Sequence, residues 1–163
     1  MSSWIIQCNP DYYDIERHIL DGNKSIFWAI KDEILKVGDE VFLWRAQGRK
    51  KANKDNSGII GRLMVVSDNE LPNDDEKYNL DDNKKLESSD SYYKLEFLEV
   101  KLIKGQFIKR CCLKEHSFLK NIGPLKFTQN TYYPLMRKEV NELRRIWGNI
   151  EQLEECVNCK KGL

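Results

Sequence analysis

The chain has no apolar run that approaches the roughly 18 residues needed to cross a bilayer. Its first residues, Met1 to Ile6, also lack the basic start and long apolar stretch of a signal peptide. Glycine and proline are scarce, with 9 and 4 residues among 163, which excludes collagen-like and low-complexity classes. These absences predict a cytoplasmic globular protein about one domain long, with no membrane partner.

Residues that commonly carry catalysis are also few. His18 and His116 are the two histidines, and neither lies beside a candidate nucleophile. The sequence contains no phosphate-binding glycine loop, no G-x-S-x-G elbow and no pair of histidines at metal-ligand spacing. We therefore predict a protein that is not an enzyme.

Five cysteines are an odd number, and in a reducing compartment thiols stay free, so disulfides are not expected to hold the fold. Cys156 and Cys159 have the spacing of half a zinc site, but the other cysteines and His116 do not follow at a matching spacing. Two free thiols in a tail and a zinc module of a longer chain both remain open. No metal site and no cofactor are predicted.

Charge is balanced overall at +1, yet it is unevenly distributed along the chain. Residues 45–56 carry a net charge of +4 and residues 101–120 carry +5, whereas residues 69–90 carry −5. A single charged run is usually a solvated surface. Two basic runs from distant parts of the sequence favour a local basic surface that could contact phosphates.

The apolar pattern predicts an α+β domain built on a strongly bent sheet. Strands are expected from Trp4 to the stop at Asn9-Pro10, and over 25–30, 40–44, 58–66, 92–103 and 125–127. A change of phase after Phe97 indicates a bulge. A helix is expected after Pro10, with Asp11 or Asp14 as its cap and Ile15 on its apolar face. Further helices are expected over 113–121 and from Pro134 onward. This domain spans residues 1–150 and includes an acidic, mobile loop at 68–91, and residues 151–163 form a tail.

Three tryptophans, Trp4, Trp28 and Trp44, lie in or beside predicted strands. Aromatic side chains on strands more often pack in a core than line a site, but here short polar segments accompany them. A flipped nucleobase needs an aromatic plane for stacking and amide or hydroxyl groups for its Watson–Crick edge. The sequence therefore predicts a base-binding pocket.

The order of short motifs resembles the EVE domain of the PUA-like superfamily, over roughly residues 3–148. The motifs that carry this resemblance are Trp4 to Pro10, Asp11 to Ile15, Ile26 to Trp28, Lys36 to Asp39, Val41 to Trp44, Gly58 to Gly61, and Leu125 to Leu135. The resemblance implies a strongly bent β-barrel with flanking helices, related to the YTH domains that read methylated adenine in RNA. It implies a non-catalytic module that binds nucleic acid and reads a modified, flipped-out cytosine or adenine.

The resemblance also assigns residues. It implies that Trp28 is a cage tryptophan and that Trp44 stacks as well, with polar groups around the base. The predicted pocket is Trp28, Trp44, Gln7, Asn9, Ser57, Gly58, Gln129, Asn130 and Thr131. The basic run at 45–56, through its charge alone, predicts phosphate contacts by Arg45, Arg49, Lys50 and Lys51. The second cage tryptophan of YTH domains has no counterpart, because Tyr78 is the one aromatic residue of loop 68–91. That departure favours a modified base other than methyladenine, or a looser pocket.

Other functions stay open at this point. PUA-like relatives of the ASCH type include hydrolases of modified nucleosides, and Lys31 with Asp32 is the pair that such chemistry would use here. An RNA-binding module is a further alternative. A nuclease or another effector domain, in a longer or a neighbouring chain, is a possible partner of any such reader.

Overall fold

A computed structural model describes residues 1–30, 34–49, 56–68, 75–80, 91–103, 106–127 and 131–150. The strands are β1 (Ser3–Cys8), β2 (Ser25–Ile30), β3 (Glu40–Arg45), β4 (Gly58–Asp68), β5 (Ser91–Val100), β6 (Ile108–Lys109) and β7 (Tyr132–Pro134). The α-helices are α1 (Ile15–Leu20), α2 (Arg110–Glu115), α3 (Gly123–Lys126) and α4 (Arg137–Gly148), and the 3-10 turns are η2 (Asp75–Tyr78) and η3 (Leu119–Asn121).

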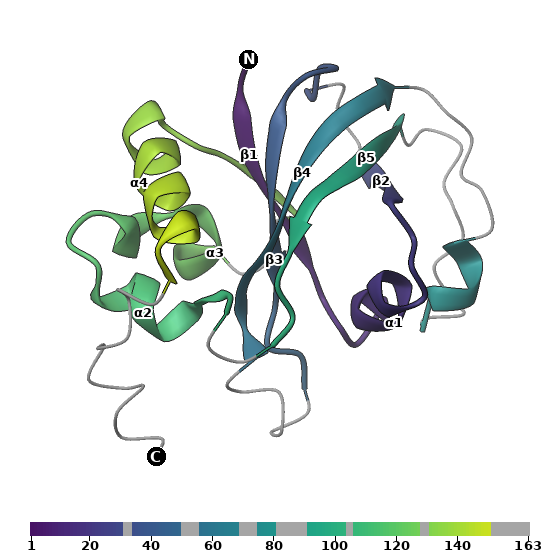
Figure 1. Cartoon of the computed structure of the whole chain (residues 1–163), viewed down its shortest axis with the longest axis horizontal. Helices are drawn as coiled ribbons and strands as arrows, with labels where there is room; N and C mark the ends of the chain where they lie inside the picture. Colours follow the sequence, from purple (N-terminus) through teal and green to yellow (C-terminus); the bar gives the residue numbers. More distant parts are fainter. Residues whose placement is uncertain are drawn as a thin grey trace.

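The strands form one strongly curled, half-barrel sheet in the order β2-β5-β4-β3-β1-β7, with β6 pairing with β4. The neighbours β1 and β3 run parallel, and the other pairs are antiparallel. Helices α2, α3 and α4 lie on one side of this sheet, and α1 lies on the other (Figure 1). The predicted α+β class and bent sheet with flanking helices are confirmed.

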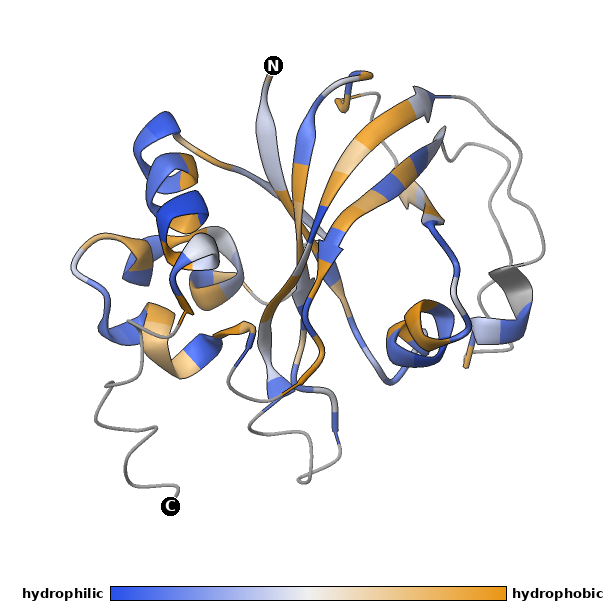
Figure 2. Cartoon of the chain, viewed as in Figure 1, coloured by the Kyte–Doolittle hydropathy of each residue, from blue (hydrophilic) through white to orange (hydrophobic). Residues whose placement is uncertain are grey.

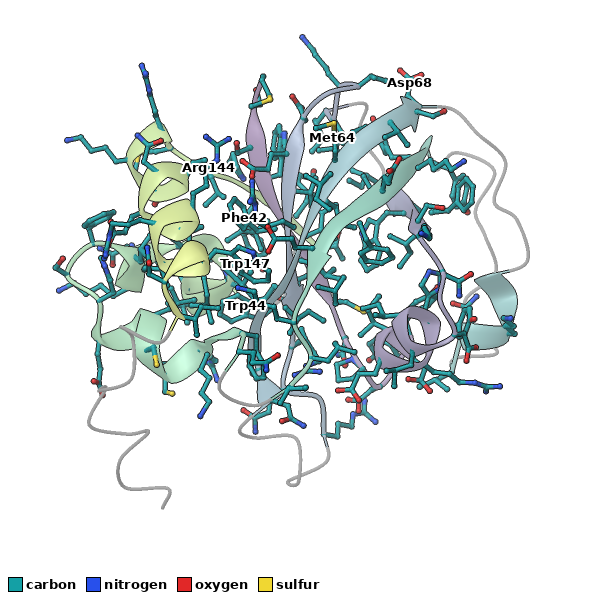
Figure 3. All side chains as sticks on the ribbon, in the orientation of Figure 1. Phe42, Trp44, Met64, Asp68, Arg144 and Trp147 are labelled. Atoms are coloured by element: carbon teal, nitrogen blue, oxygen red, sulfur yellow. The ribbon has the colours of Figure 1, made fainter. Side chains whose placement is uncertain are left out.

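Each side of the sheet carries its own apolar core, because successive strand side chains point to opposite faces. On β3, Val41 and Leu43 pack with Ile15 of α1, whereas Phe42 and Trp44 pack with Trp147 of α4. Figure 3 shows Phe42 and Trp44 on the side of the sheet that faces α4 and Trp147. Figure 2 shows the strands alternating between hydrophobic and hydrophilic residues, while every residue of β3 is buried.

The predicted bulge on β5 is confirmed. Arg62 pairs with Glu99, and the next residue of β4, Leu63, pairs with Phe97, so Leu98 is the extra residue. This extra residue is the reason for the change of phase in the sequence after Phe97.

Two element predictions near the C-terminus are wrong. Residues 123–126 form helix α3 instead of a strand, because Pro124 occupies its first turn, where a missing N–H costs nothing. Pro134 does not begin the last helix, since it ends β7, an edge strand in which proline is tolerated. Helix α4 begins at Arg137, where the Glu139 carboxylate accepts the Met136 N–H at 2.8 Å.

Part of the acidic segment 68–91 packs against α1 through Tyr78. Its ring is fully buried, its hydroxyl donates to Asp21 at 2.8 Å and accepts from Asn23 at 2.8 Å, and its carbonyl accepts the Asp14 N–H at 2.8 Å. Residues 75–80 are therefore anchored. The predicted mobility of residues 69–74 and 81–90 falls outside the described residues, as do the tail 151–163 and its Cys156 and Cys159.

Within the described ranges, no group of His, Cys, Asp and Glu is placed to hold a metal ion. None of the helices in this part of the chain is both long enough and apolar enough to span a membrane.

Replacement of Glu40 by glutamine is expected to lower the free energy of unfolding by about 2 kcal/mol. Glu40 is buried on β3 and accepts charge-assisted hydrogen bonds, each of 2.6 Å, from Arg62 of β4 and Arg144 of α4. We expect a smaller loss of stability than for a fully buried ion pair, because the Arg144 side chain is 40% exposed and water weakens its attraction to Glu40. Urea denaturation measures the change, with exposed Glu96→Gln on β5 as the control. Equal losses of stability in Glu40→Gln and Glu96→Gln would contradict the role of Glu40 in joining the sheet to α4.

Candidate nucleic-acid interface

Four segments that are distant in sequence meet at one edge of the sheet. Because β1 and β3 are parallel, their carboxyl ends lie together, and the register pairs Gln7 with Trp44 and Cys8 with Arg45. Arg45 also pairs with Gly58 at the start of β4, and the Gln7 N–H donates to the Thr131 carbonyl at 2.9 Å. The segments predicted to form the pocket around Gln7, Ser57 and Thr131 are thus brought together.

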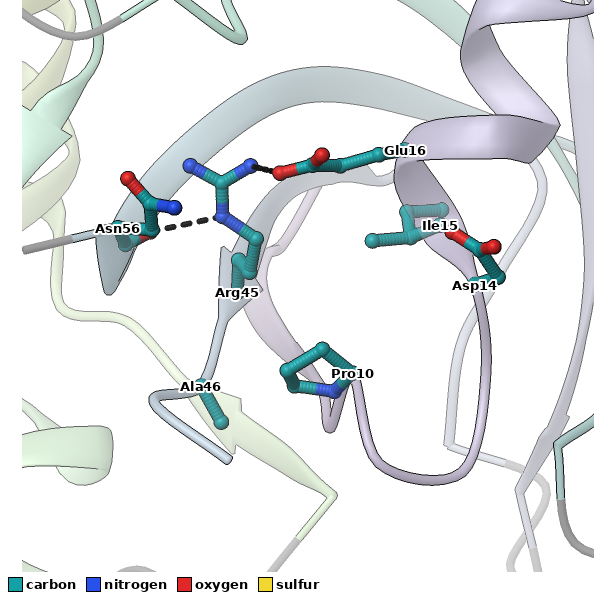
Figure 4. Close-up of a pocket in the computed structure, with 7 residues that line it drawn as sticks. All are labelled: Pro10, Asp14, Ile15, Glu16, Arg45, Ala46 and Asn56. Atoms are coloured by element: carbon teal, nitrogen blue, oxygen red, sulfur yellow. Dashed lines mark hydrogen bonds and ion pairs between the residues drawn. The ribbon is translucent and has the colours of Figure 1, made fainter. Parts of the chain in front are cut away.

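A cavity of about 230 Å³ opens at this edge, between the ends of β1 and β3 and the start of α1 (Figure 4). It is smaller than the roughly 300–1,000 Å³ that drug-sized ligands occupy. Pro10, Ile15 and Ala46 give it apolar walls. The described residues that line it are Pro10, Asp14, Ile15, Glu16, Arg45, Ala46 and Asn56.

Local hydrogen bonds hold these walls in place. The Ala46 N–H donates to the Cys8 carbonyl at 2.8 Å, which extends the pairing of β1 with β3 one residue beyond the end of β3. Asp14 caps α1 by accepting the Arg17 N–H at 3.2 Å, as one of the two predicted caps. The cap fixes the turn from which Ile15 and Glu16 face the cavity.

Arg45 contributes a positive charge to the cavity wall, and it is 2% exposed. Its Nε donates to the Asn56 carbonyl at 2.7 Å, its Nη1 donates to the Glu16 carboxylate, and its guanidinium lies 5.0 Å from the centroid of the Phe107 ring. Burial lowers the pKa of Arg45 from its usual value, and the neighbouring Glu16 carboxylate opposes that shift. Nη2 is buried and has no hydrogen-bond partner among the described residues.

The rim of the cavity carries an exposed arginine. Asn9 accepts the Asp11 N–H at 2.9 Å, and the Asp11 carboxylate in turn accepts the Arg49 N–H at 2.8 Å. Gly48 makes this turn with a φ of 69°, and a side chain there would meet Asp11 and Pro10. The Arg49 side chain is exposed, and its backbone is held beside Asp11, the neighbour of Pro10 in the cavity lining.

No family model and no curated protein matches the chain. Solved structures do match it over nearly its whole length. A hypothetical protein from Leishmania major is 17% identical with a TM-score of 0.61, over 95% of this chain and 98% of its own. A protein from Pseudomonas putida is 16% identical with a TM-score of 0.61, over 90% and 99%.

Human THYN1, solved in complex with DNA that contains 5-methylcytosine, is 20% identical with a TM-score of 0.53, over 96% of this chain and 99% of its own. The DUF55 domain of human thymocyte nuclear protein 1 is 20% identical with a TM-score of 0.55. At these identities the matches establish the fold: the chain shares the fold of these proteins, as the resemblance to the EVE domain implied.

Two residues that the sequence predicted for the site have side chains buried inside the protein. Trp44 is 2% exposed and packs in the core beneath α4, which replaces the predicted stacking role with a packing role. The Arg45 guanidinium is buried and paired with Glu16, so it forms part of the cavity wall instead of contacting a phosphate on the surface. Both residues lie near the cavity because β3 ends there, but both side chains are buried in the protein.

Other predicted residues differ in how close they lie to the cavity. Half-buried Trp28 sits on β2, paired with Tyr93 of β5, and it does not line the cavity. Ser57 is 3% exposed, and its carbonyl accepts the Arg110 N–H at 2.9 Å. Thr131 is exposed before β7. Several predicted residues lie outside the described ranges: Lys31, Asp32, Lys50, Lys51, Gln129 and Asn130.

Sequence reasoning missed Glu16 and the apolar walls Pro10 and Ile15. The sequence predicts Asp14 as a helix cap and Ile15 on an apolar helix face. Both residues have these roles, and both also line the cavity, which the sequence does not indicate. Glu16 reads as a solvated helix residue in the sequence, and its carboxylate is indeed 48% exposed. Only the packing of α1 against the end of β3 places it opposite Arg45.

Proposed function

We propose that this protein is a nucleic-acid-binding module that accepts one modified, flipped-out base in the cavity between β1, β3 and α1, without catalysing a reaction on it. The observation that carries the proposal is the cavity itself, which combines apolar walls with a buried, incompletely bonded arginine. A flipped base needs this combination, because its ring loses stacking and its edge loses hydrogen bonds when it leaves the duplex.

Modified cytosine is the first candidate for the base. Human THYN1, which shares the fold at 20% identity, was solved with DNA containing 5-methylcytosine, and this supports the choice by analogy. The apolar walls formed by Pro10, Ile15 and Ala46 offer a surface suited to a methyl group. Exposed Arg49 at the rim is suited to a backbone phosphate.

The test is a titration of labelled duplexes that differ at one central base. Cytosine, 5-methylcytosine, 5-hydroxymethylcytosine, adenine and N6-methyladenine are compared in DNA, and the same series where available is compared in RNA. We expect one modified cytosine in DNA to bind at least about 10-fold more tightly than cytosine, which corresponds to about 1.4 kcal/mol. Fluorescence anisotropy at fixed salt measures the dissociation constants.

A blocking variant links the preference to the cavity. Ala46→Met should fill the space between Pro10 and Ile15 and reduce the preference to less than about 3-fold. The matched control is Ala29→Met. Ala29 is half-buried on β2, which is separated from β1 by β5, β4 and β3 in the sheet order. Equal, weak binding of every duplex would overturn the proposal. Preference for an RNA, or turnover of a modified nucleoside, would favour the alternative functions instead.

A further inference from the structure

One donor in the cavity wall lacks a partner although the group that carries it is held rigidly. Asn56 fixes Nε of Arg45, Glu16 fixes Nη1, and the ring of Phe107 lies against the guanidinium. The remaining nitrogen, Nη2, is buried with no hydrogen-bond partner in the described part of the chain. A buried donor without an acceptor is costly, and buried groups of this kind are nearly always satisfied by protein, water or a ligand.

The same wall also supplies an acceptor. One oxygen of the Glu16 carboxylate receives Arg45, and the side chain is about half exposed. No other partner of this carboxylate occurs among the described residues. The two residues that carry this donor and this acceptor, of opposite charge, therefore line the same small cavity (Figure 4).

We infer that Arg45 and Glu16 together determine which base is accepted, by selecting an amino group next to a ring acceptor. This inference rests on the proposed function. Arg45 donates to the ring nitrogen or carbonyl of the base, while Glu16 accepts from its amino group, as carboxylates accept from the cytosine N4 amino group. Cytosine and adenine present such an edge.

Thymine is the informative counterexample. It has the same ring as 5-methylcytosine and the same methyl group, but it carries a carbonyl at position 4 and a proton on N3. That carbonyl would face the Glu16 carboxylate, which places two acceptors against each other. The N3 proton would face the Arg45 N–H, which places two donors against each other. A site that reads the methyl group alone would not distinguish these two bases.

The experiment compares 5-methylcytosine with thymine, each placed opposite an abasic site so that neither base loses a pairing partner when it flips. The wild-type protein should bind 5-methylcytosine roughly 10-fold or more tightly than thymine. Glu16→Gln should reduce this ratio to less than about 3-fold, because an amide can present either a donor or an acceptor. Arg45→Lys should lower affinity for 5-methylcytosine about 10-fold, because lysine lacks the planar fork.

Two controls separate reading of the base from general effects. Arg137→Lys makes the same change at an exposed arginine of α4, on the other side of the sheet from α1, and should leave the ratio unchanged. Glu96→Gln makes the matching change at an exposed carboxylate of β5. A ratio measured on one preparation does not depend on the fraction of active protein, so it remains valid if a variant is less stable. Thermal melting monitors that stability.

The outcomes distinguish the two proposals. If the wild-type protein prefers 5-methylcytosine to cytosine but its ratio to thymine survives both Glu16→Gln and Arg45→Lys, the inference is wrong and the proposed function stands. If the wild-type protein prefers no modified base, both are wrong. An arm with adenine against guanine tests whether the cavity also accepts a purine with the same edge.

Discussion

Replacement of Gly58 by alanine is expected to lower the free energy of unfolding by about 4 kcal/mol. Gly58 begins β4 with a φ of 151°, and an added Cβ would lie against the Ile108 carbonyl oxygen and 2.9 Å from the Lys109 Cα. These atoms belong to the backbone of the paired strand β6, so they cannot rotate away as a flexible side chain could. The backbone strain and the overpacking each cost about 1–3 kcal/mol.

Two other glycines separate these two costs. Gly22 has a φ of 86° with nothing within 4 Å of an added Cβ, so Gly22→Ala should cost only the strain, about 1–2 kcal/mol. Gly148 at the end of α4 has open space as well and no positive φ, so Gly148→Ala should be neutral or stabilise by up to about 1 kcal/mol. Urea denaturation of the three variants measures the series. A Gly58→Ala variant as stable as Gly22→Ala would contradict the close contact with β6.

Replacement of Trp44 by alanine is expected to cost about 3–5 kcal/mol of stability. Trp44 is almost completely buried between the sheet and the helical layer, where it packs in one cluster with Ile59, Leu143 and Trp147. The register of β3 sends its side chain to this face, while Leu43 and Arg45 point to the other. The structure therefore predicts a loss of packing rather than a loss of base contact.

A conservative variant distinguishes packing from stacking. Trp44→Phe should lower stability by a smaller amount and leave the ratio of dissociation constants for modified and unmodified duplexes unchanged. Ala46→Met, two residues later on the cavity wall, is the positive control for loss of that ratio. A Trp44→Phe protein that is fully folded but has lost its preference would restore the stacking role predicted from the sequence.

Local sequence patterns predicted most of the elements, because the features that determine them act over a few residues. Short apolar runs specified β3 and β4, Asp14 specified the start of α1, and the change of phase after Phe97 specified the bulge at Leu98. The errors occurred where a local signal has two meanings. Pro134 is tolerated equally at the first turn of a helix and in an edge strand, and only the pairing with Trp4 decides between them.

The site depended more strongly on tertiary structure. The sequence alone determined the α+β class, the bent sheet and the segments that meet near Gln7, Ser57 and Thr131, since the order of motifs carries this information. It could not determine that Arg45 turns inward and Trp44 lies under α4, because both orientations follow from the pairing register of β3 with β1 and β4. Nor could it determine the pairing of Arg45 with Glu16, which are 29 residues apart and meet only because α1 packs against the end of β3. A charged residue such as Arg45 is predicted on the surface from the sequence alone. Only the fold decides whether that charge is buried in the wall of a cavity, where it can recognise a ligand.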